Sequence, residues 1–395
     1  MGIKNNLFNA DFVLSRNRQP WIDYVRGICI IMVCYRHCFD GLTNADIQTQ
    51  GYIVFKYLNV FLFSFRMPLF FIVSGLFVAA SLNKKGLGNY VSDRFKVIFY
   101  PLLVWGTIQI TLQLQFAPYV NAHREVIDYL NLIIYPRKIE QFWYLNALFV
   151  VGVIYAFIKV KLKLTSLQHL AVALVFYGIG GYLHAIRTGA FIFTDVFHYY
   201  LFFAIGDNIS QFVLNKDKAK YFTQLKYVLP VFVLFIITHY FFTKINLRHN
   251  QDYYIEHYMP LFFLVVALTG CCFIVQISFL LEKAGILKFL RIVGYHSLFI
   301  YVMHLIVLAA TRALLVHVFD ISSVPVLLTI GISMGITLPI IIYNILSKAG
   351  AWWLFSLKKP VEELNFTKET YKKKLLASNK VYETVTPGKS YTGTQ

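Results

Sequence analysis

The sequence has 395 residues, of which 58% are hydrophobic and only 14% are charged. Soluble domains carry roughly 25% charged residues, so this composition excludes an ordinary soluble protein and indicates a chain solvated by lipid. The formal net charge of +18 could serve nucleic-acid binding, and the placement of the charges along the chain therefore decides its meaning.

Ten apolar stretches follow one another along the chain, each long enough for a membrane-spanning helix. Such a helix needs about 20 apolar residues, because the hydrocarbon core is roughly 30 Å thick and its backbone groups must be paired internally. The predicted fold is an all-α polytopic membrane protein, a bundle of ten transmembrane helices. The second stretch is long enough to contain a break around Arg66-Met67-Pro68. The predicted spans are 21–39, 52–81, 95–117, 142–158, 167–185, 191–213, 225–243, 257–281, 294–317 and 324–347.

The segments between these stretches carry an asymmetric charge. With the N-terminus placed inside, 26 of the 37 Lys and Arg lie in inner segments, 6 lie in outer loops and 5 lie within the spans. Short loops rich in Lys and Arg stay in the cytoplasm, so the distribution favours ten spans with both termini cytoplasmic. The basic charge thus fits topology and contact with anionic membrane lipids, and no nucleic-acid partner is expected. We expect a multi-pass protein of the cell (inner, cytoplasmic) membrane.

The composition also divides the chain into three segments. Residues 1–20 form a cytoplasmic N-terminal segment, residues 21–347 form the membrane domain, and residues 348–395 form a polar, partly disordered cytoplasmic tail. The five cysteines all lie in predicted spans, and neither they nor the histidines show metal-ligand spacing. No metal site is therefore predicted.

The first span carries charged residues in a regular pattern. Asp23, Arg26 and His37 lie on one helical face, because the step from Arg26 to His37 makes three turns plus about 20°. It also separates the two by roughly 16 Å along the helix axis, with Arg26 toward the cytoplasm. A charged side chain near mid-membrane costs about 2.5–3.5 kcal/mol, so such groups usually face a protein interior or a wet cavity. The spacing equally fits an interfacial Asp23–Arg26 ion pair and a His37 that is merely satisfied by a neighbouring helix.

Residues near His37 and in the second span extend this pattern. Arg36 is expected to point about 100° away from His37 and to reach the membrane interface. Asp40, three residues after His37, is a candidate to orient the imidazole ring. Arg66 is either functional or ion-paired within the protein, or it reaches the interface from a helix end.

Later segments supply further candidates, each with a structural alternative. Arg94 and Lys96 precede the third span, where ordinary positive-inside charge is also expected. Trp143 lies where an outer aromatic belt is expected, and it could also stack on a sugar ring. Tyr301 and His304 share a helix face, and they either line a cavity or make structural hydrogen bonds.

Four sequence motifs occur in order along these spans. They are Arg26 and His37 with ten residues between them, Met67-Pro68-Leu69-Phe70-Phe71 with Ser74-Gly75, Phe142-Trp143-Tyr144-Leu145, and Ser297 with Tyr301 and His304. Together they resemble the acyltransferase-3 family of integral membrane O-acyltransferases, which acylate sugars of bacterial surface glycans, antibiotics and related molecules. The resemblance covers residues 20–347, and the ten helices of the family agree with the hydropathy.

The resemblance implies transfer of an acyl group from cytoplasmic acyl-CoA to a hydroxyl of a sugar in a surface or lipid-linked glycan. Acetyl is the commonest group in the family, so acetyl-CoA is the expected donor substrate, and no bound cofactor is expected. His37 and Arg26 become the catalytic candidates, since an imidazole can take up a hydroxyl proton near neutral pH. Glycan-assembly proteins are the expected protein partners.

The same resemblance implies two further groups of residues. Cations at the inner mouth would hold the phosphates of the donor, and the donor-binding candidates are Arg94, Lys96 and Arg66. Candidates to line the cavity are Asp23, Tyr301, His304 and Trp143. One position departs from the family pattern, an Arg-x-x-Arg pair before the third helix. Here Arg94 is followed three places later by Val97, and the candidate substitute Lys96 lacks the planar fork of arginine.

Two other function classes are compatible with a ten-helix bundle. A secondary transporter also places charges in its helices, but it commonly shows interrupted helices in both halves, whereas the charges here gather in the first three spans. A non-catalytic membrane component of glycan assembly or export would share the hydropathy and the topology. Acyl transfer that depends on His37 would distinguish the enzyme from both.

Overall fold

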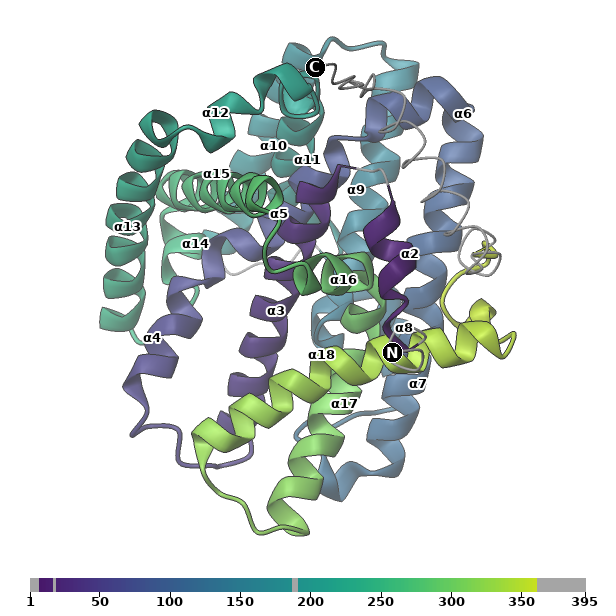
Figure 1. The fold of residues 1–395 in the computed structure, drawn as a ribbon, viewed down its shortest axis with the longest axis vertical. Helices are drawn as coiled ribbons and strands as arrows, with labels where there is room; N and C mark the ends of the chain where they lie inside the picture. The colour runs from purple at the N-terminus through teal and green to yellow at the C-terminus, as the bar shows by residue number, and fades with distance from the viewer. Residues whose placement is uncertain (1–6, 17–18, 187–190, 361–395) are drawn as a thin grey trace, which may run out of the picture. The chain divides into compact units, whose positions relative to one another are not determined.

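The computed structural model describes residues 7–16, 19–186 and 191–360, and the chain divides into two units, Met1–Lys358 and Lys359–Gln395. All regular elements of the described residues are helices of the first unit, which confirms the all-α fold (Figure 1). Most of the predicted cytoplasmic tail, from residue 361 onward, lies outside the described residues.

The helices vary in length from single turns to spans of 25 residues. In chain order the α-helices are α2 (Ala10–Ser15), α3 (Pro20–Thr43), α4 (Ile53–Phe61), α5 (Phe63–Gly75), α6 (Val78–Arg94), α7 (Tyr100–Gln115), α8 (Asp128–Ile134), α9 (Phe142–Lys161), α10 (Ser166–Ala185), α11 (Phe193–Val213), α12 (Lys220–Thr223), α13 (Leu225–Arg248), α14 (Tyr254–Tyr258), α15 (Pro260–Ala284), α16 (Phe289–Tyr295), α17 (Ser297–His317) and α18 (Val324–Lys348). A π-helical turn, η1 (Phe95–Phe99), joins α6 to α7, and 3-10 turns occur at η2 (Ala117–Tyr119), η3 (Pro136–Ile139), η4 (Lys216–Lys218) and η5 (Trp352–Leu354).

Each of the ten predicted spans coincides with one to three of these helices. Within the described residues, eight helical stretches are long and apolar enough to cross a membrane, so the chain is a multi-pass membrane protein. The stretches that contain α3 and α11 are not among the eight. Both helices carry charged residues, among them Asp23, Arg26 and Arg36 in α3 and Asp195 and Asp207 in α11.

Two boundaries differ from the predicted ones. The predicted break at Arg66-Met67-Pro68 is wrong, because the interruption lies at Leu62 and α5 runs through Pro68. A proline inside a helix removes one backbone hydrogen bond, and in membrane helices the surrounding protein commonly compensates for the loss. The segment predicted as a basic inner loop after the second span is instead α6, which turns at Gly86 with φ 73° and ψ 169°. Glycine adopts this positive φ without steric cost.

Helix α3 packs against six others, namely α4, α5, α15, α16, α17 and α18, and Figure 1 shows it in the middle of the bundle. The contact with α16 depends on two glycines. A Cβ atom at Gly27 would lie 2.2 Å from a carbonyl oxygen of α16, and one at Gly294 would lie 1.8 Å from a carbonyl oxygen of α3. Gly75 and Gly206 allow the same close approach between α5 and α11. Small residues of this kind are how membrane helices bring their backbones together.

Two connecting segments reach the C-terminal end of α3. From the segment 116–141, Asn121 donates a hydrogen bond to the carbonyl oxygen of Gly41 at 3.0 Å. From the segment 249–259, the carboxylate of Asp252 lies 3.2 Å from the guanidinium of Arg36. These segments therefore bring polar residues from distant parts of the sequence to one end of the central helix.

Candidate functional site

The two ends of α3 line different cavities. Arg26 and Asp23 line a cavity of about 1080 Å³, called the Arg26 cavity below. His37 lines two others, a large His37 cavity of about 790 Å³ and a small His37 chamber of about 90 Å³. The Arg26 cavity shares no lining residue with either His37 cavity, so the two ends of α3 belong to separate cavities.

The Arg26 cavity is rich in cationic side chains. They come from three parts of the chain, namely α3, the connection between α11 and α13, and the end of α15. The charged residues that line it are Arg26, Lys216, Lys220 and Lys283, together with the carboxylates Asp23 and Glu282. In the sequence the lysines were read only as positive-inside charge, because nothing in their spacing links them to Arg26.

His37 lies at the junction of the large His37 cavity and the small His37 chamber. Its side chain is half-buried, and within the described part of the chain neither ring nitrogen has a hydrogen-bond partner. The centroid of its ring lies 5.2 Å from that of His304 in α17. The structure thus brings together two histidines that are 267 positions apart in the sequence.

His304 is buried beside His37 and is held through one nitrogen. Its Nδ1 lies 3.1 Å from the carbonyl oxygen of Ile300 and 2.7 Å from that of Tyr301. A carbonyl only accepts, so this geometry places the ring proton on Nδ1 and leaves Nε2 as an acceptor. Among the described residues no group pairs with the buried Nε2.

The small His37 chamber is lined by three arginines, and two of them are paired with carboxylates. The Nε of Arg36 lies 2.7 Å from Asp40, and its Nη1 lies 3.2 Å from Asp252. A third contact is the hydrogen bond that Arg36 donates to the hydroxyl of Tyr253 at 2.9 Å. The prediction that Arg36 reaches the interface was therefore wrong, because these partners, two of them from a distant loop, hold it inside the protein.

Asp40 also differs from its prediction. One carboxylate oxygen accepts from Arg36, and the other accepts from the Nδ2 of Asn59 at 2.9 Å. Both oxygens are occupied by these partners, so Asp40 does not orient the ring of His37. Asp40 instead lines the large His37 cavity and anchors Arg36, which lines the small His37 chamber.

Arg137, the second paired arginine of the chamber, comes from η3. Its Nη2 lies 2.6 Å from the carboxylate of Asp195, which is almost fully buried in α11. Its guanidinium also lies 4.6 Å from the ring centroid of Trp143. This pairing leaves the charge of Arg137 largely compensated.

Arg66, the third arginine, differs from the other two. Its residue is 4% exposed, and its Nη1 donates to the carbonyl oxygen of Met32 at 3.0 Å. The guanidinium also lies 5.4 Å from the ring centroid of Phe63. Within the described residues no carboxylate lies within 4.0 Å of it. The structure therefore places Arg66 with His37 and leaves its charge without an ion-pair partner.

Glu256, in α14, is the carboxylate that lines the small chamber. It is 2% exposed, and its Oε1 lies 3.5 Å from the Nε2 of His198. Burial raises the pKa of the Glu256 carboxyl to about 7, although the Arg137 guanidinium opposes the rise. The carboxyl is therefore partly protonated near neutral pH and only partly adds negative charge to the chamber.

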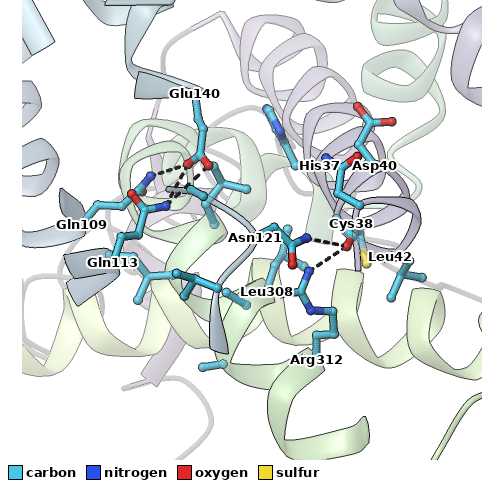
Figure 2. Close-up of a pocket in the computed structure, with 18 of the residues that line it drawn as sticks. His37, Cys38, Asp40, Leu42, Gln109, Gln113, Asn121, Glu140, Leu308 and Arg312 are labelled. Carbon is cyan, nitrogen blue, oxygen red and sulfur yellow. Dashed lines mark hydrogen bonds between the residues drawn. The ribbon is translucent and has the colours of Figure 1, made fainter. Parts of the chain in front are cut away.

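Polar side chains on opposite sides line the large His37 cavity, as Figure 2 shows. On one side the carboxylate of Glu140 accepts from the Nε2 of Gln109 at 2.7 Å and from that of Gln113 at 3.2 Å. Glu140 has φ 48°, a conformation that costs a non-glycine residue roughly 1–3 kcal/mol and commonly marks functional sites. On the other side, with His37, Arg312 donates to the carbonyl oxygen of Gly41 at 2.6 Å.

Two of the predicted cavity residues reach the His37 cavities. Trp143 lines both of them and packs against Tyr199 with ring centroids 5.4 Å apart, so it lies inside the bundle rather than in an outer belt. Tyr301 lines the small chamber, and its hydroxyl donates to the carbonyl oxygen of Gln141. His304 lies beside His37, whereas Asp23 lies at the Arg26 cavity.

The three donor-binding candidates do not lie together. The guanidinium of Arg94 donates to the carbonyl oxygen of Leu148 at 2.7 Å and to the hydroxyl of Ser74 at 3.4 Å, and it lines none of the three cavities. The carbonyl oxygen of Lys96 accepts from the backbone N–H of Leu357 at 3.2 Å. Arg66 belongs to the small His37 chamber instead. The structure thus separates Arg94 and Lys96 from both ends of α3 that line cavities.

Comparison with known proteins identifies a family whose sequence model covers the helices described above. The sequence model of the acyltransferase-3 family, described as an acyltransferase domain, matches residues 19–344. The inner membrane protein YcfT of Escherichia coli is 28% identical over 96 residues, which cover 22% of this chain and 26% of YcfT. The nodulation protein NolL of Mesorhizobium japonicum is 24% identical over 163 residues, which cover 40% of this chain and 42% of that protein.

A second nodulation protein NolL, from Sinorhizobium fredii, is 28% identical over 91 residues, which cover 23% of this chain and 24% of that protein. The chain thus spans between 24% and 42% of the length of these curated relatives. No solved structure matches the chain. The family match extends over α3 and both of its cavity-lined ends.

Proposed function

Since the chain belongs to the acyltransferase-3 family and is an O-acyltransferase of the membrane, we propose that it moves an acyl group from cytoplasmic acyl-CoA to a sugar hydroxyl. Acetyl is the proposed group, and the proposed acceptor is a surface or lipid-linked glycan. The observation that carries the proposal is the position of His37 at the junction of two cavities, with ring nitrogens that have no hydrogen-bond partner among the described residues. Membrane lipids and glycan-assembly proteins are the proposed partners.

The proposed topology has ten spans, with α3 and α11 crossing the membrane beside the eight apolar stretches. Charged residues in a spanning helix are tolerated where they face protein or a cavity, and the charged residues of α3 line cavities at both ends. The distribution of Lys and Arg supports cytoplasmic termini and places the Arg26 cavity toward the cytoplasm. The printed name of the Escherichia coli relative, an inner membrane protein, supports the cytoplasmic membrane as the location.

The Arg26 cavity is the proposed entrance for the donor. Acyl-CoA carries phosphates, and Arg and Lys side chains recognise phosphate through charge-assisted hydrogen bonds. The cavity offers four cations against two carboxylates. In the proposed topology it would face the cytoplasm, where acyl-CoA is made. This assignment replaces Arg94 and Lys96 as the main phosphate ligands by Lys216, Lys220 and Lys283, with Arg26 retained.

The large His37 cavity is the proposed acceptor site. Sugars are bound by hydrogen bonds to their hydroxyls and by stacking on aromatic rings, and the cavity presents Glu140, Gln109 and Gln113 together with Trp143. The roughly 16 Å between Arg26 and His37 is comparable to the length of a pantetheine arm. The arm would have to pass from the Arg26 cavity to the His37 cavities, which have no lining residue in common.

His37 is the proposed general base. It would take the proton from the acceptor hydroxyl as the oxygen attacks the thioester carbonyl carbon. The C–O bond forms, the C–S bond breaks, and the departing thiolate takes the proton back from His37. His304 keeps its own proton on Nδ1 and presents Nε2 as an acceptor, so it can help to retain His37 in the required orientation.

Membranes from cells that express the protein test the proposal. Radiolabelled acetyl-CoA should label the glycan and lipid-linked fractions, and His37→Ala should reduce the rate roughly 100- to 10,000-fold, the range expected for loss of a general base. His249→Ala is the matched control, because His249 is exposed and stacks on Tyr254 away from all three cavities. A folded His37→Ala protein that labels glycan at the wild-type rate would refute the role of His37.

A further inference from the structure

We propose that the small His37 chamber binds the thioester carbonyl of a short acyl group and that Arg66 donates to the oxyanion that forms during transfer. This inference rests on the proposed function and assigns Arg66 a catalytic role rather than donor binding. The chamber is lined by Arg66, His37, Tyr301 and Trp143 among others. It thus combines the proposed base with a cation in one small space.

The burial of Arg66 is the first observation behind this assignment. A guanidinium that is 4% exposed has lost most of its hydration, and an isolated buried charge costs several kcal/mol unless it is paired. The contacts of Arg66 are the carbonyl oxygen of Met32 and the ring of Phe63, neither of which carries a charge. A protein retains such a cation where a ligand or a transition state supplies the negative charge.

The other arginines of the chamber sharpen the contrast. Arg36 has two carboxylates within 3.2 Å, and Arg137 has one at 2.6 Å, so both are compensated in the resting protein. Glu256 also lines the chamber, but it faces His198 at 3.5 Å and lies more than 4.0 Å from Arg66. Of the three guanidiniums, only that of Arg66 retains a charge available to a new anion.

The volume of the chamber limits the size of the group. About 90 Å³ holds roughly three water molecules at about 30 Å³ each. An acetyl group has as many non-hydrogen atoms as three waters, whereas an octanoyl chain has several times more. An acetyl or propionyl group would therefore fit within the chamber, whereas a medium-chain group would have to extend out of it.

The chemistry of the step fits a cation at this position. When the acceptor oxygen attacks, the π electrons of the thioester C=O move onto its oxygen, and a tetrahedral oxyanion forms. Arg66 donates a hydrogen bond to that oxygen from the water-poor chamber, where such a donor has its largest effect. The oxyanion collapses, the C=O bond re-forms, the C–S bond breaks, and the thiolate accepts the proton held by His37.

The test uses the full-length protein in liposomes with acetyl-CoA as donor and a panel of p-nitrophenyl hexosides as acceptors. Arg66→Gln should lower kcat by 100- to 1000-fold, the loss observed when one oxyanion donor is removed. The inhibition constant of CoA should stay within threefold of wild type, because the phosphates bind elsewhere. Arg66→Lys should recover part of the loss, since it restores the charge without the planar fork.

Arg312→Gln is the matched control. Arg312 also donates to a carbonyl oxygen of α3, that of Gly41, but it lies in the large His37 cavity and away from the chamber. It should alter the acceptor KM more than kcat. A second measurement avoids variants altogether, because the wild-type protein should transfer octanoyl at least tenfold more slowly than acetyl.

Three outcomes would overturn the inference. They are a folded Arg66→Gln protein with kcat within threefold of wild type, a rise in the inhibition constant of CoA with unchanged kcat, and equal rates for acetyl and octanoyl donors. Failure of the proposed function looks different, because the wild-type protein would then transfer no acyl group from any acyl-CoA. Transfer that needs His37 but not Arg66 would sink the role of Arg66 alone.

Discussion

The two ends of α3 are fixed within the protein by different kinds of contact. At the Arg26 end, Gly27 brings α3 into backbone contact with α16, and the charged side chains are left to line an open cavity. At the His37 end, side chains from distant segments hold the helix: Arg36 pairs with Asp40 and Asp252, and the carbonyl oxygen of Gly41 accepts from Asn121 and Arg312.

This difference distinguishes charged side chains that hold the fold together from charged side chains that can bind a ligand. Where backbone contact fixes a helix, its charged side chains can line a ligand cavity, as proposed for the phosphates of the donor. Where ion pairs fix the helix, most charged side chains already have an oppositely charged partner. The side chains without a carboxylate partner are then candidates to bind a ligand. At the His37 end these include His37 and Arg66, which both line the small His37 chamber, and this is why the chemistry is proposed there.

The largest expected effect tests the backbone contact at the Arg26 end. Gly27→Ala adds a Cβ atom that would lie 2.2 Å from the carbonyl oxygen of Leu290, and backbone atoms cannot move aside as a side chain could. We expect a loss of about 1–3 kcal/mol, the usual cost of overpacking, or a displaced α16. Thermal unfolding in detergent should show a midpoint several degrees lower.

Gly41→Ala is the control on the same helix. A Cβ atom there would lie 3.6 Å from the guanidinium of Arg312, an ordinary contact, so the unfolding midpoint should change by no more than about a degree. Equal shifts for the two substitutions would show that the two ends of α3 do not differ as described.

The next effect concerns the cations of the Arg26 cavity. A protein with both Lys216→Gln and Lys220→Gln should show a KM for acetyl-CoA about tenfold higher with little change in kcat, since each partly exposed phosphate contact contributes roughly 0.5–1 kcal/mol. The difference from wild type should shrink at high salt, because salt screens exposed charges.

The matched control replaces Lys161 and Lys163, which are exposed cations of another predicted inner segment and line none of the three cavities. This protein should keep the wild-type KM. If both double variants raise the KM equally, general positive charge rather than the Arg26 cavity attracts the donor.

The sequence predicted the helices far better than the pairing of their polar residues. Long apolar runs fix where a spanning helix can lie, so each of the ten predicted spans coincides with a helix. The interruption at Leu62 and the helix α6 were missed, because Pro68 and the basic residues before Arg94 are typical of breaks and loops in the absence of tertiary contacts.

The site was predictable only along a single helix. The Arg26–His37 spacing lies within α3 and was read correctly as two positions on one helix, roughly 16 Å apart. Two of the partners of Arg36, Asp252 and Tyr253, come from a loop more than 200 positions away, and no periodicity reports such a contact. Lys216 and Lys220 were seen as topology signals for the same reason, since only the fold places them beside Arg26.

The smallest expected effect is a change in KM for the acceptor, which tests whether the large His37 cavity and the Arg26 cavity bind different substrates. Glu140→Gln removes the charge of a carboxylate that faces the proposed acceptor site while keeping its shape and its strained backbone. Ionised acceptors make stronger hydrogen bonds to hydroxyls than amides do, so the KM for the hexoside acceptor should rise about three- to fivefold. The KM for acetyl-CoA should stay unchanged, which is the reverse of the pattern expected for Lys216 and Lys220.

Glu125→Gln is the control for this comparison, because Glu125 belongs to the same connecting segment but is exposed and lines none of the three cavities. A change in the acetyl-CoA KM caused by Glu140→Gln would place donor and acceptor in one continuous site. In that case the separation of the cavities in the resting protein would be a closed state of a single channel, and the two ends of α3 would act on the same bound molecule. If the Lys216 and Lys220 substitutions raise only the KM for acetyl-CoA and Glu140→Gln raises only the KM for the acceptor, each end of the helix binds one substrate.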